Sequence, residues 1–254
     1  MSQTPHFPAP DDSPVTSLDY FRSLQFITEN PKWLQNVLFL AVCQMLPFVG
    51  PLLISGYQFE VAESLLHRTK AGSYVDFDFD RFKDYLLRGL WPFLVTLVCS
   101  MILTFPFAIL WMGTFFAFVA AGKANGPPPE LMILGFACVF FVVILISIAF
   151  NVLLVPLLLR AGYSQDFGQA FNFQFAKNFL ALMWKETLLA TLFLVIIAFP
   201  LFFVGTLLCF IGVYFTTSIL MLAYAHLIDY QLYALYLSRG GEPIPLKSTA
   251  IQEV

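Results

Sequence analysis

Long, mostly apolar stretches of the chain alternate with short stretches in which charged and polar residues gather. The apolar stretches cover residues 33–59, 89–121, 131–159 and 188–237. A helix of about 20 apolar residues is long enough to cross the ~30 Å hydrocarbon layer of a membrane. The pattern therefore predicts an all-α integral membrane protein with about six transmembrane helices, arranged as three hairpins.

The first apolar stretch, residues 33–59, permits two arrangements. It is either one long span kinked at Pro47, or a hairpin of two short helices that turns at residues 47–51. Pro47 and Pro51 each lack a backbone N–H donor, and Gly50 between them favours a reversal of the chain. We therefore favour the hairpin, with a second helix that runs from about Pro51 through His67.

The stretch 89–121 is too long for one upright span and too short for two. Pro92 and Pro106 would kink a helix here, so we expect one long, tilted, broken helix. The segment 122–129 combines glycines with three consecutive prolines. It predicts a stiff reversal before the next span.

The charged segment 69–88 has the periodicity of an amphipathic helix. Asp78 can cap such a helix, whose apolar side would include Phe79 and Phe82. Asp84 and Arg88 are four residues apart and would form an ion pair on the polar side. We expect this helix to lie on the cytoplasmic surface of the membrane and to lead into the next span.

A second segment, residues 162–180, has a similar pattern. Phenylalanines recur every four residues from Phe167 to Phe179, which predicts a second amphipathic surface helix. Asp166 and Phe167 correspond to Asp78 and Phe79 of the first segment, so the two segments form a weak internal repeat. The aromatic residues expected to anchor the protein at the membrane interface are Trp33, Phe79, Phe82, Phe167 and Phe171.

Composition agrees with a membrane protein. Hydrophobic residues make up 59% of the chain and charged residues 11%. Soluble domains have roughly 45–50% and about 25%. The net charge is −3 and no basic patch is present, so nucleic acid is not an expected partner. Residues 1–17 are expected to form a disordered N-terminal tail without a cleaved signal peptide, residues 18–240 a single polytopic membrane domain, and residues 241–254 a C-terminal tail.

The distribution of basic residues predicts orientation. Lys and Arg collect on the cytoplasmic side of membrane proteins. When the connections between six spans are numbered in order, all 13 Lys and Arg residues except Lys123 fall on the same side. Both termini are therefore expected in the cytoplasm, and if residues 33–59 form a single span, the N-terminal tail alone moves outside.

A few ionisable residues interrupt the apolar segments. Such groups cost about 2.5–3.5 kcal/mol each at membrane depth, so they usually face a protein interior and have a role there. We identify a candidate intramembrane cluster between the second and last spans, composed of Glu60, Glu63, His67, Asn151, His226 and Asp229. It is interpreted as a structural hydrogen-bonded cluster, with a proton or cation path and a metal or catalytic site as alternatives.

No catalytic, phosphate-binding or dinucleotide-binding motif is present, so no catalytic residue, cofactor or metal is assigned. The acidic run Asp76-x-Asp78-x-Asp80 differs from a calcium loop, which needs Gly where Arg81 stands and Glu where Leu87 stands. Acidic residues are favourable at the N-terminus of a helix, and this explains the run more simply.

Several short motifs resemble one family. These are Asn30-Pro31-Lys32-Trp33, the turn at 46–51, Gly56-Tyr57, the acidic run 76–80 with Arg88-Gly89-Leu90, Gln169-Ala170-Phe171, and the helix 226–233. Together, over residues 18–240, they resemble the bacterial multi-pass membrane family called domain of unknown function 4013. The resemblance implies a protein of the bacterial cytoplasmic membrane and supplies no catalytic residue.

Two functions remain open at this point. One is a non-enzymatic scaffold, assembly factor or lipid-interacting protein, whose partners are membrane lipid, other membrane proteins or a second copy of the chain. The other is a small transporter or channel that uses the polar cluster.

Overall fold

The computed structural model describes residues 16–67, 74–121, 128–208 and 211–247. These residues form helices and no strand, which confirms the all-α prediction. In chain order the elements are α1 (Arg22–Glu29), α2 (Trp33–Gln44), α3 (Val49–His67), the 3₁₀ turn η1 (Phe79–Arg81), α4 (Phe82–Ala121), α5 (Pro129–Ser164), α6 (Phe167–Ala170), α7 (Phe173–Leu207), α8 (Ile211–Tyr224), the π-helix η2 (Ala225–Leu232) and α9 (Tyr233–Ser238).

Four helical segments are long and apolar enough to cross a membrane. They are Phe79–Ala120, Ile133–Ser164, Phe173–Leu207 and Ile211–Ser238, whereas α2 is apolar but shorter. The prediction of six spans is therefore not confirmed. The difference lies at α2, which is too short, and at α3, which carries Gln58, Glu60 and Glu63 and is buried by other helices along most of its length.

The predicted break in residues 33–59 is confirmed. Helix α2 ends at Gln44 and α3 begins at Val49, two residues earlier than expected. Phe48 between them has a positive φ of 63°, and the Gly50 N–H donates to the Leu46 carbonyl at 2.8 Å. Two helices thus follow one another through a tight reversal, as the paired prolines indicate.

Two glycines bring α3 and α4 into backbone contact. A Cβ added to Gly56 would overlap the backbone carbonyl of Tyr85, and one added to Gly89 would overlap the carbonyl of Leu52. Small residues permit such close crossings of helices in membranes, where packing drives association. The contact fixes how α4 is rotated against α3, and hence which of its side chains face inward.

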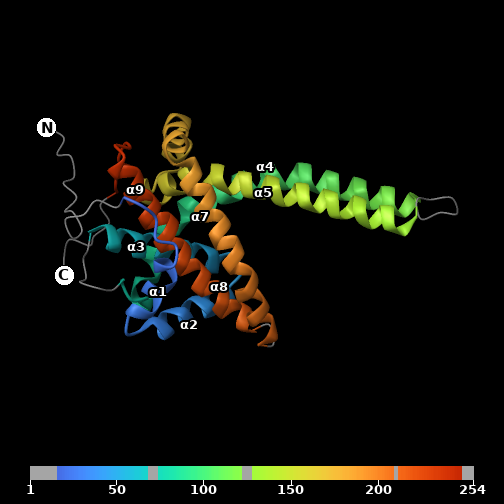
Figure 1. Ribbon diagram of the computed structural model, residues 1–254. Helices are drawn as coiled ribbons and strands as arrows, with labels where there is room; N and C mark the ends of the chain where they lie inside the picture. Colours follow the sequence, from blue (N-terminus) through green and yellow to red (C-terminus); the bar gives the residue numbers. More distant parts are fainter. Residues whose placement is uncertain (1–15, 68–73, 122–127, 209–210, 248–254) are drawn as a thin grey trace.

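Beyond this crossing, α4 and α5 continue as a long hairpin that leaves the rest of the molecule (Figure 1). We call residues 101–121 and 128–149 the arm, and the rest of the described helical structure the core. Helix α4 runs through Pro92 and Pro106 without a break, so the prediction of one long helix is confirmed and the predicted break at the prolines is wrong. Of the predicted reversal 122–129, residues 122–127 lie outside the described part, and Pro129 begins α5.

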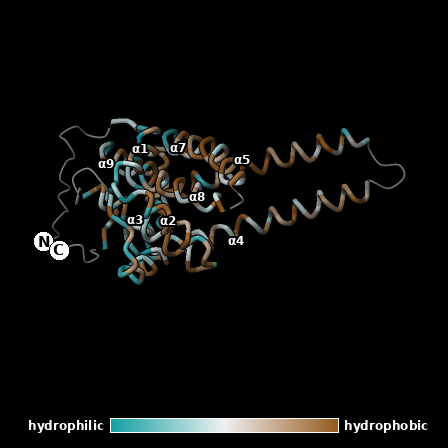
Figure 2. The backbone as a smooth tube through the Cα atoms, turned by 90° about the horizontal axis from the view of Figure 1, so that it is seen from below, coloured by the Kyte–Doolittle hydropathy of each residue, from teal (hydrophilic) through white to brown (hydrophobic). Residues whose placement is uncertain are grey.

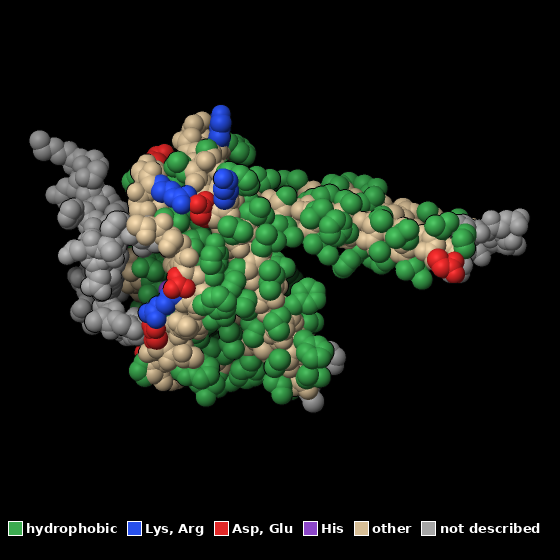
Figure 3. Space-filling view, viewed as in Figure 1, with side chains coloured by type: hydrophobic (Ala, Val, Ile, Leu, Met, Phe, Trp, Pro, Cys, Tyr) green, Lys and Arg blue, Asp and Glu red, His purple; other side chains and the backbone are tan. Residues whose placement is uncertain are grey.

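The arm is apolar along most of its length (Figure 2), and Glu130 near its outer end is its one charged residue among those described. Its two helices touch through rings, with Trp111 and Phe136 centroids 5.2 Å apart. Most other large side chains point outward; Phe105 is 72% exposed and Ile133 is 70% exposed. In the space-filling view hydrophobic side chains cover the arm, while Lys and Arg gather on the core (Figure 3).

The two predicted surface helices are not found as separate elements. Asp78 caps η1 by accepting from the Asp80 N–H at 2.9 Å, and the chain then passes directly into α4. Asp166 caps the four-residue α6, and Asn172 caps α7. The capping role of Asp78 is confirmed, while the amphipathic surface position is not, because each segment is joined to a long apolar helix.

The chain ends pack on the core where they are described. Residues 241–247 of the predicted C-terminal tail lie along α5 and α9: the Ile244 N–H donates to the Tyr233 hydroxyl at 2.8 Å, and the Lys247 N–H donates to the Tyr163 carbonyl at 3.3 Å. Residues 1–15 and 248–254, the remaining parts of the two predicted tails, lie outside the described residues.

Candidate functional site

The candidate site is built around α3, whose polar residues face the start of α4. Glu60 is 1% exposed and Glu63 is 7% exposed. Because a buried carboxylate is unfavourable without a partner, each must be compensated inside the protein. The close α3–α4 crossing at Gly56 and Gly89 places two arginines of the next segment within reach.

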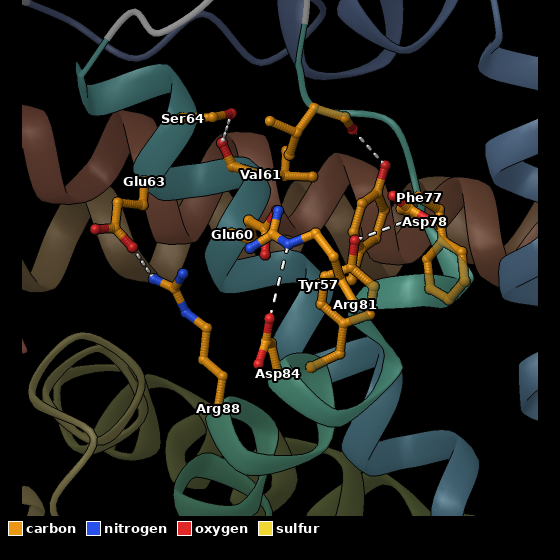
Figure 4. Close-up of polar contacts among 12 residues, drawn as sticks. Tyr57, Glu60, Val61, Glu63, Ser64, Phe77, Asp78, Arg81, Asp84 and Arg88 are labelled. Carbon is orange, nitrogen blue, oxygen red and sulfur yellow. Dashed lines mark hydrogen bonds and ion pairs between the residues drawn. The ribbon is translucent and has the colours of Figure 1, made fainter. Parts of the chain in front are cut away.

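Two ion pairs join these elements (Figure 4). Arg81 donates to Glu60 from η1, and Arg88 donates to Glu63 from α4. Arg81 also lies 3.9 Å from Asp84, and its side chain is 37% exposed. The pair of Arg88 and Glu63 is enclosed, with side-chain exposures of 4% and 9%.

The position of Arg88 corrects the prediction for segment 69–88. We expected Arg88 on an exposed polar face, paired with Asp84 four residues before it. It instead points into the core, because the rotation of α4 is fixed by the glycine crossing rather than by the amphipathic pattern of its first turns. The sequence signal that could have found this pair is the glycine at position 89, directly after the arginine.

The two glutamates differ in their electrostatic surroundings. Burial raises the pKa of Glu60, and the Arg81 and Arg88 guanidinium groups partly oppose that effect. His67, one turn further along α3, places its Nε2 3.9 Å from Glu63 Oε1. Glu63 thus lies between Arg88 and His67, and the three residues form one connected group at the end of α3.

The acidic run before α4 has structural contacts. Asp76 accepts from the Asn30 side-chain amide at 2.9 Å and pairs with Lys32 at 3.3 Å. Asn30 also donates to the Tyr74 carbonyl, and the Asn36 side chain accepts from the Phe77 N–H. The run therefore ties the start of α4 to α1 and α2.

The other predicted members of the cluster, His226 and Asp229, lie in the π-helix η2. His226 is stacked on Phe26 of α1, with ring centroids 4.2 Å apart, and its Nδ1 is 3.0 Å from Gln231 Nε2. Gln231 in turn bonds the backbone of Asp19. This network attaches the N-terminal segment to η2.

Asp229 is 2% exposed and belongs to a different contact. The Tyr163 hydroxyl of α5 donates to the Asp229 backbone carbonyl at 2.5 Å, and the Tyr163 ring stacks on Tyr233 at 4.8 Å. A π-helical turn leaves backbone carbonyls less regularly paired, so a hydroxyl donor from a neighbouring helix is favourable there. The contact holds η2 against α5.

The structure thus brings the predicted cluster residues into the same core but not into one hydrogen-bonded set. Helix α3 packs against η2. Among the described residues, however, no hydrogen bond or ion pair links Glu60 or Glu63 to His226 or Asp229. Asn151 lies apart, on an exposed face of α5, where its amide donates to the Ser147 carbonyl at 2.8 Å.

The predicted interfacial aromatic residues are half-buried or exposed. Phe79 is 49% exposed and makes an edge contact with Phe39, with centroids 4.7 Å apart. Phe167 and Phe171 touch each other at 5.1 Å, next to the bases of α4 and α5. Trp33 and Phe82 pack against the rim of the core.

One buried residue was missed by the sequence analysis. Arg160, on α5, is 7% exposed, and its guanidinium carbon lies 5.0 Å from the centre of the Phe175 ring. Its Nε and Nη1 atoms are buried without a hydrogen-bond partner. Arg160 directly follows the apolar run 131–159 and was counted only as a basic residue of the cytoplasmic side.

The chain matches one family model, described as a protein of unknown function (DUF4013), over residues 39–210. This range is narrower than the 18–240 expected, and it contains Glu60, Glu63 and Arg160 but ends before η2. No curated protein and no solved structure matches the chain. Because the match covers more than half of the chain and agrees with the resemblance in its motifs, the chain belongs to the DUF4013 family of proteins of unknown function.

Proposed function

We propose that this chain is an integral protein of the bacterial cytoplasmic membrane that acts without catalysis, as a scaffold or assembly factor engaging lipid or other membrane proteins. Four segments cross the membrane in this proposal, and α1, α2 and α3 form a cap at its cytoplasmic face. The observation that carries it is the arm, which offers a long apolar surface and no site for chemistry among its described residues.

The arm supports this proposal through its composition and exposure. Its outward side chains are almost all large and apolar, with Met101, Ile102 and Phe116 each at least 60% exposed. Soluble proteins rarely present apolar patches of more than a few hundred Å². A lipid layer or the apolar surface of another membrane protein is the environment in which such a hairpin is stable.

The polar groups of the core also support the scaffold proposal, because they do not form a transport path. A transport path needs ionisable groups that face a hydrated passage. Glu60 and Glu63 are instead engaged by Arg81 and Arg88, and His226 is stacked between elements. These groups fix the arrangement of helices and so favour a scaffold.

Basic residues give the proposed orientation. With four spans, Lys123, which lies in the sequence between the first two spans, is again separated from the other twelve of the 13 Lys and Arg residues, so the termini and the core face the cytoplasm. Cysteine labelling from outside intact cells tests this. A Lys123→Cys protein should react with an impermeant maleimide and a Lys83→Cys protein should not; the reverse pattern would invert the topology.

The placement of the arm in lipid is tested with Cys138, an exposed native cysteine on α5. A fluorophore is attached to it after Cys43, Cys99 and Cys209 are replaced by alanine, and the protein is reconstituted in liposomes. Acyl chains brominated at mid-depth should quench the fluorophore strongly, while iodide in the buffer should not. Quenching by iodide would contradict an arm that is embedded in lipid.

Flux measurements separate the scaffold from the transporter. Liposomes containing the parent protein should conduct protons and monovalent cations no faster than protein-free liposomes. Flux that is present in the parent and lost in the Glu60→Gln or Asp229→Asn variant would overturn the scaffold proposal in favour of transport.

A further inference from the structure

Arg160 is a buried cation that has no ion-pair partner among the residues that the structure describes. It lies one turn before the end of the candidate span Ile133–Ser164, and its side chain is covered by protein. The Nε and Nη1 atoms have no hydrogen-bond acceptor, and the guanidinium group lies over the face of Phe175. A stacking ring interacts with the positive charge but cannot accept N–H bonds in the guanidinium plane.

The other arginines that reach into the core differ from Arg160. Arg81 has Glu60 and Arg88 has Glu63, each supplied by α3. In the part of the chain that is described, no acidic side chain forms an ion pair with Arg160. An arginine remains charged at any physiological pH, so this residue cannot relieve its burial by losing a proton.

The surroundings of Arg160 narrow the choice of ligand. Arg160 lies over Phe175, whose ring makes an edge contact with Tyr236 at 5.7 Å between centroids, and Tyr236 neighbours Tyr233. Both hydroxyls already accept backbone N–H groups from the C-terminal segment, Tyr233 from Ile244 and Tyr236 from Glu242. Neither hydroxyl accepts from Nε or Nη1 of Arg160, so a further acceptor for these two donors would lie beside aromatic rings.

We propose that Arg160 binds the phosphate group of a membrane phospholipid. A phosphate ester offers several charged oxygen acceptors, which match the free guanidinium donors, and arginine is well suited to such recognition. Arg160 lies where an apolar span ends on the side with nearly all the basic residues, which is the level of the phospholipid headgroups. Acyl chains can then follow the apolar surfaces of α5 and α7.

This proposal rests on the membrane embedding proposed above, but its test does not require a bilayer. The full chain is purified in a neutral detergent, and its thermal unfolding midpoint is measured with dihexanoyl-phosphatidylglycerol or with inorganic phosphate. For the parent, a saturating concentration of the short-chain lipid should raise the midpoint by about 5 °C or more. Because neither flux nor topology enters the measurement, its failure is distinct from failure of the proposed function.

Variants assign the effect to Arg160. Arg160→Gln should lose the lipid-dependent rise and Arg160→Lys should keep part of it. The matched control is Arg239→Gln, which removes an arginine whose ion pair with Glu186 is only partly covered, and it should keep the full rise. An Arg160→Gln protein that is stabilised as much as the parent overturns the proposal, as does a parent that responds to neither probe.

Two further measurements complete the test. A rise with inorganic phosphate as large as that with the lipid would assign the same Arg160 site to free phosphate and overturn the lipid as its occupant. Without any phosphate compound, Arg160→Met should unfold at the same or a higher temperature than the parent, because it removes an uncompensated buried charge. A clearly lower midpoint for Arg160→Met would mean that the protein itself compensates Arg160, and the proposal would fall.

Discussion

Helices α4 and α5 run from the core into the arm, and their side chains follow opposite rules in the two regions. At their bases, α4 and α5 contribute Tyr85, Arg88 and Tyr163, all of which are nearly or fully buried. Further along, the same helices expose Ile102, Phe105 and Phe141. The polar side chains are inside and the apolar ones outside, which is the distribution expected where lipid, rather than water, surrounds the helices.

This difference shows which region of the molecule determines how the helices pack against one another. In the core, hydrogen bonds and ion pairs from distant parts of the chain fix which helix faces which. In the arm, ring contacts such as Trp111 with Phe136 hold two helices together without determining a neighbour. Substitutions should therefore have large effects in the core and small ones in the arm.

The largest effect is expected at Glu63, which holds the buried Arg88. Replacing Glu63 with alanine leaves that arginine without its partner and should lower the free energy of unfolding by about 3–5 kcal/mol. The matched pair of Glu186 and Arg239 is partly exposed. Breaking it with Glu186→Ala should cost about 1 kcal/mol or less. Unfolding of both proteins in detergent is followed by tryptophan fluorescence, and equal costs would mean that the core pair is not enclosed.

Glycines provide a matched pair of substitutions in the two regions. A methyl group at Gly89 meets the Leu52 carbonyl, whereas a Cβ at Gly113, in the arm, has no neighbouring atom. Gly89→Ala should therefore cost about 1–3 kcal/mol. Gly113→Ala should stabilise α4 by up to about 1 kcal/mol through helix propensity. Thermal unfolding midpoints measure both, and a neutral Gly89→Ala would contradict the close α3–α4 crossing.

Loss of a single hydrogen bond gives a smaller contrast. The Tyr57 hydroxyl donates to the Val75 carbonyl at 2.8 Å. Removing this donor with Tyr57→Phe should lower the free energy of unfolding by about 1 kcal/mol. The arm control is Phe105→Leu, at a side chain that is largely exposed. This change should alter the free energy of unfolding by no more than about 0.5 kcal/mol.

Denaturation of both variants in detergent, followed by tryptophan fluorescence, measures this contrast. If Phe105→Leu proves more damaging than Tyr57→Phe, the arm has a protein partner within the preparation. Cross-linking would then identify that partner.

The smallest effect is a pH dependence at Glu60. Because burial raises its pKa above the ordinary 4.5, the folded protein binds this proton more readily than the unfolded chain does. Stability from this group therefore increases as the pH falls from neutral toward 4.5, and it is lost again as the pH rises. Between about pH 7.5 and about pH 5, the parent should gain stability relative to Glu60→Gln. A constant difference between the two thermal midpoints would exclude the shift.

Local features of the fold could be predicted from the sequence because their causes are local. The capping role of Asp78 and the break between α2 and α3 depend on residues within one or two turns. The single long helix of residues 89–121 follows from the length of its apolar run, although it continues through Pro92 and Pro106 instead of breaking there. Each of these needs no information about distant neighbours.

Features that depend on distant neighbours could not be predicted. Arg88 has Asp84 four residues away and Glu63 on another helix, and only the crossing at Gly56 and Gly89 decides between them. Helix α3 is apolar enough to suggest a span, but protein surrounds it along most of its length. The hydrophobic periodicity of a helix indicates that one of its faces is buried, but it does not indicate which neighbouring element buries that face.

The π-helix η2 has a consequence for the helical phase of the last segment. Each residue of an α-helix advances the side-chain direction by about 100°, so the wider turns of a π-helix shift the register of all that follows. At the start of η2 His226 meets Phe26 of α1, and directly after η2 Tyr233 meets Tyr163 of α5. The continuous helical segment α8–η2–α9 therefore directs one set of side chains toward α1 and another set toward α5. It completes the core between these two parts of the chain.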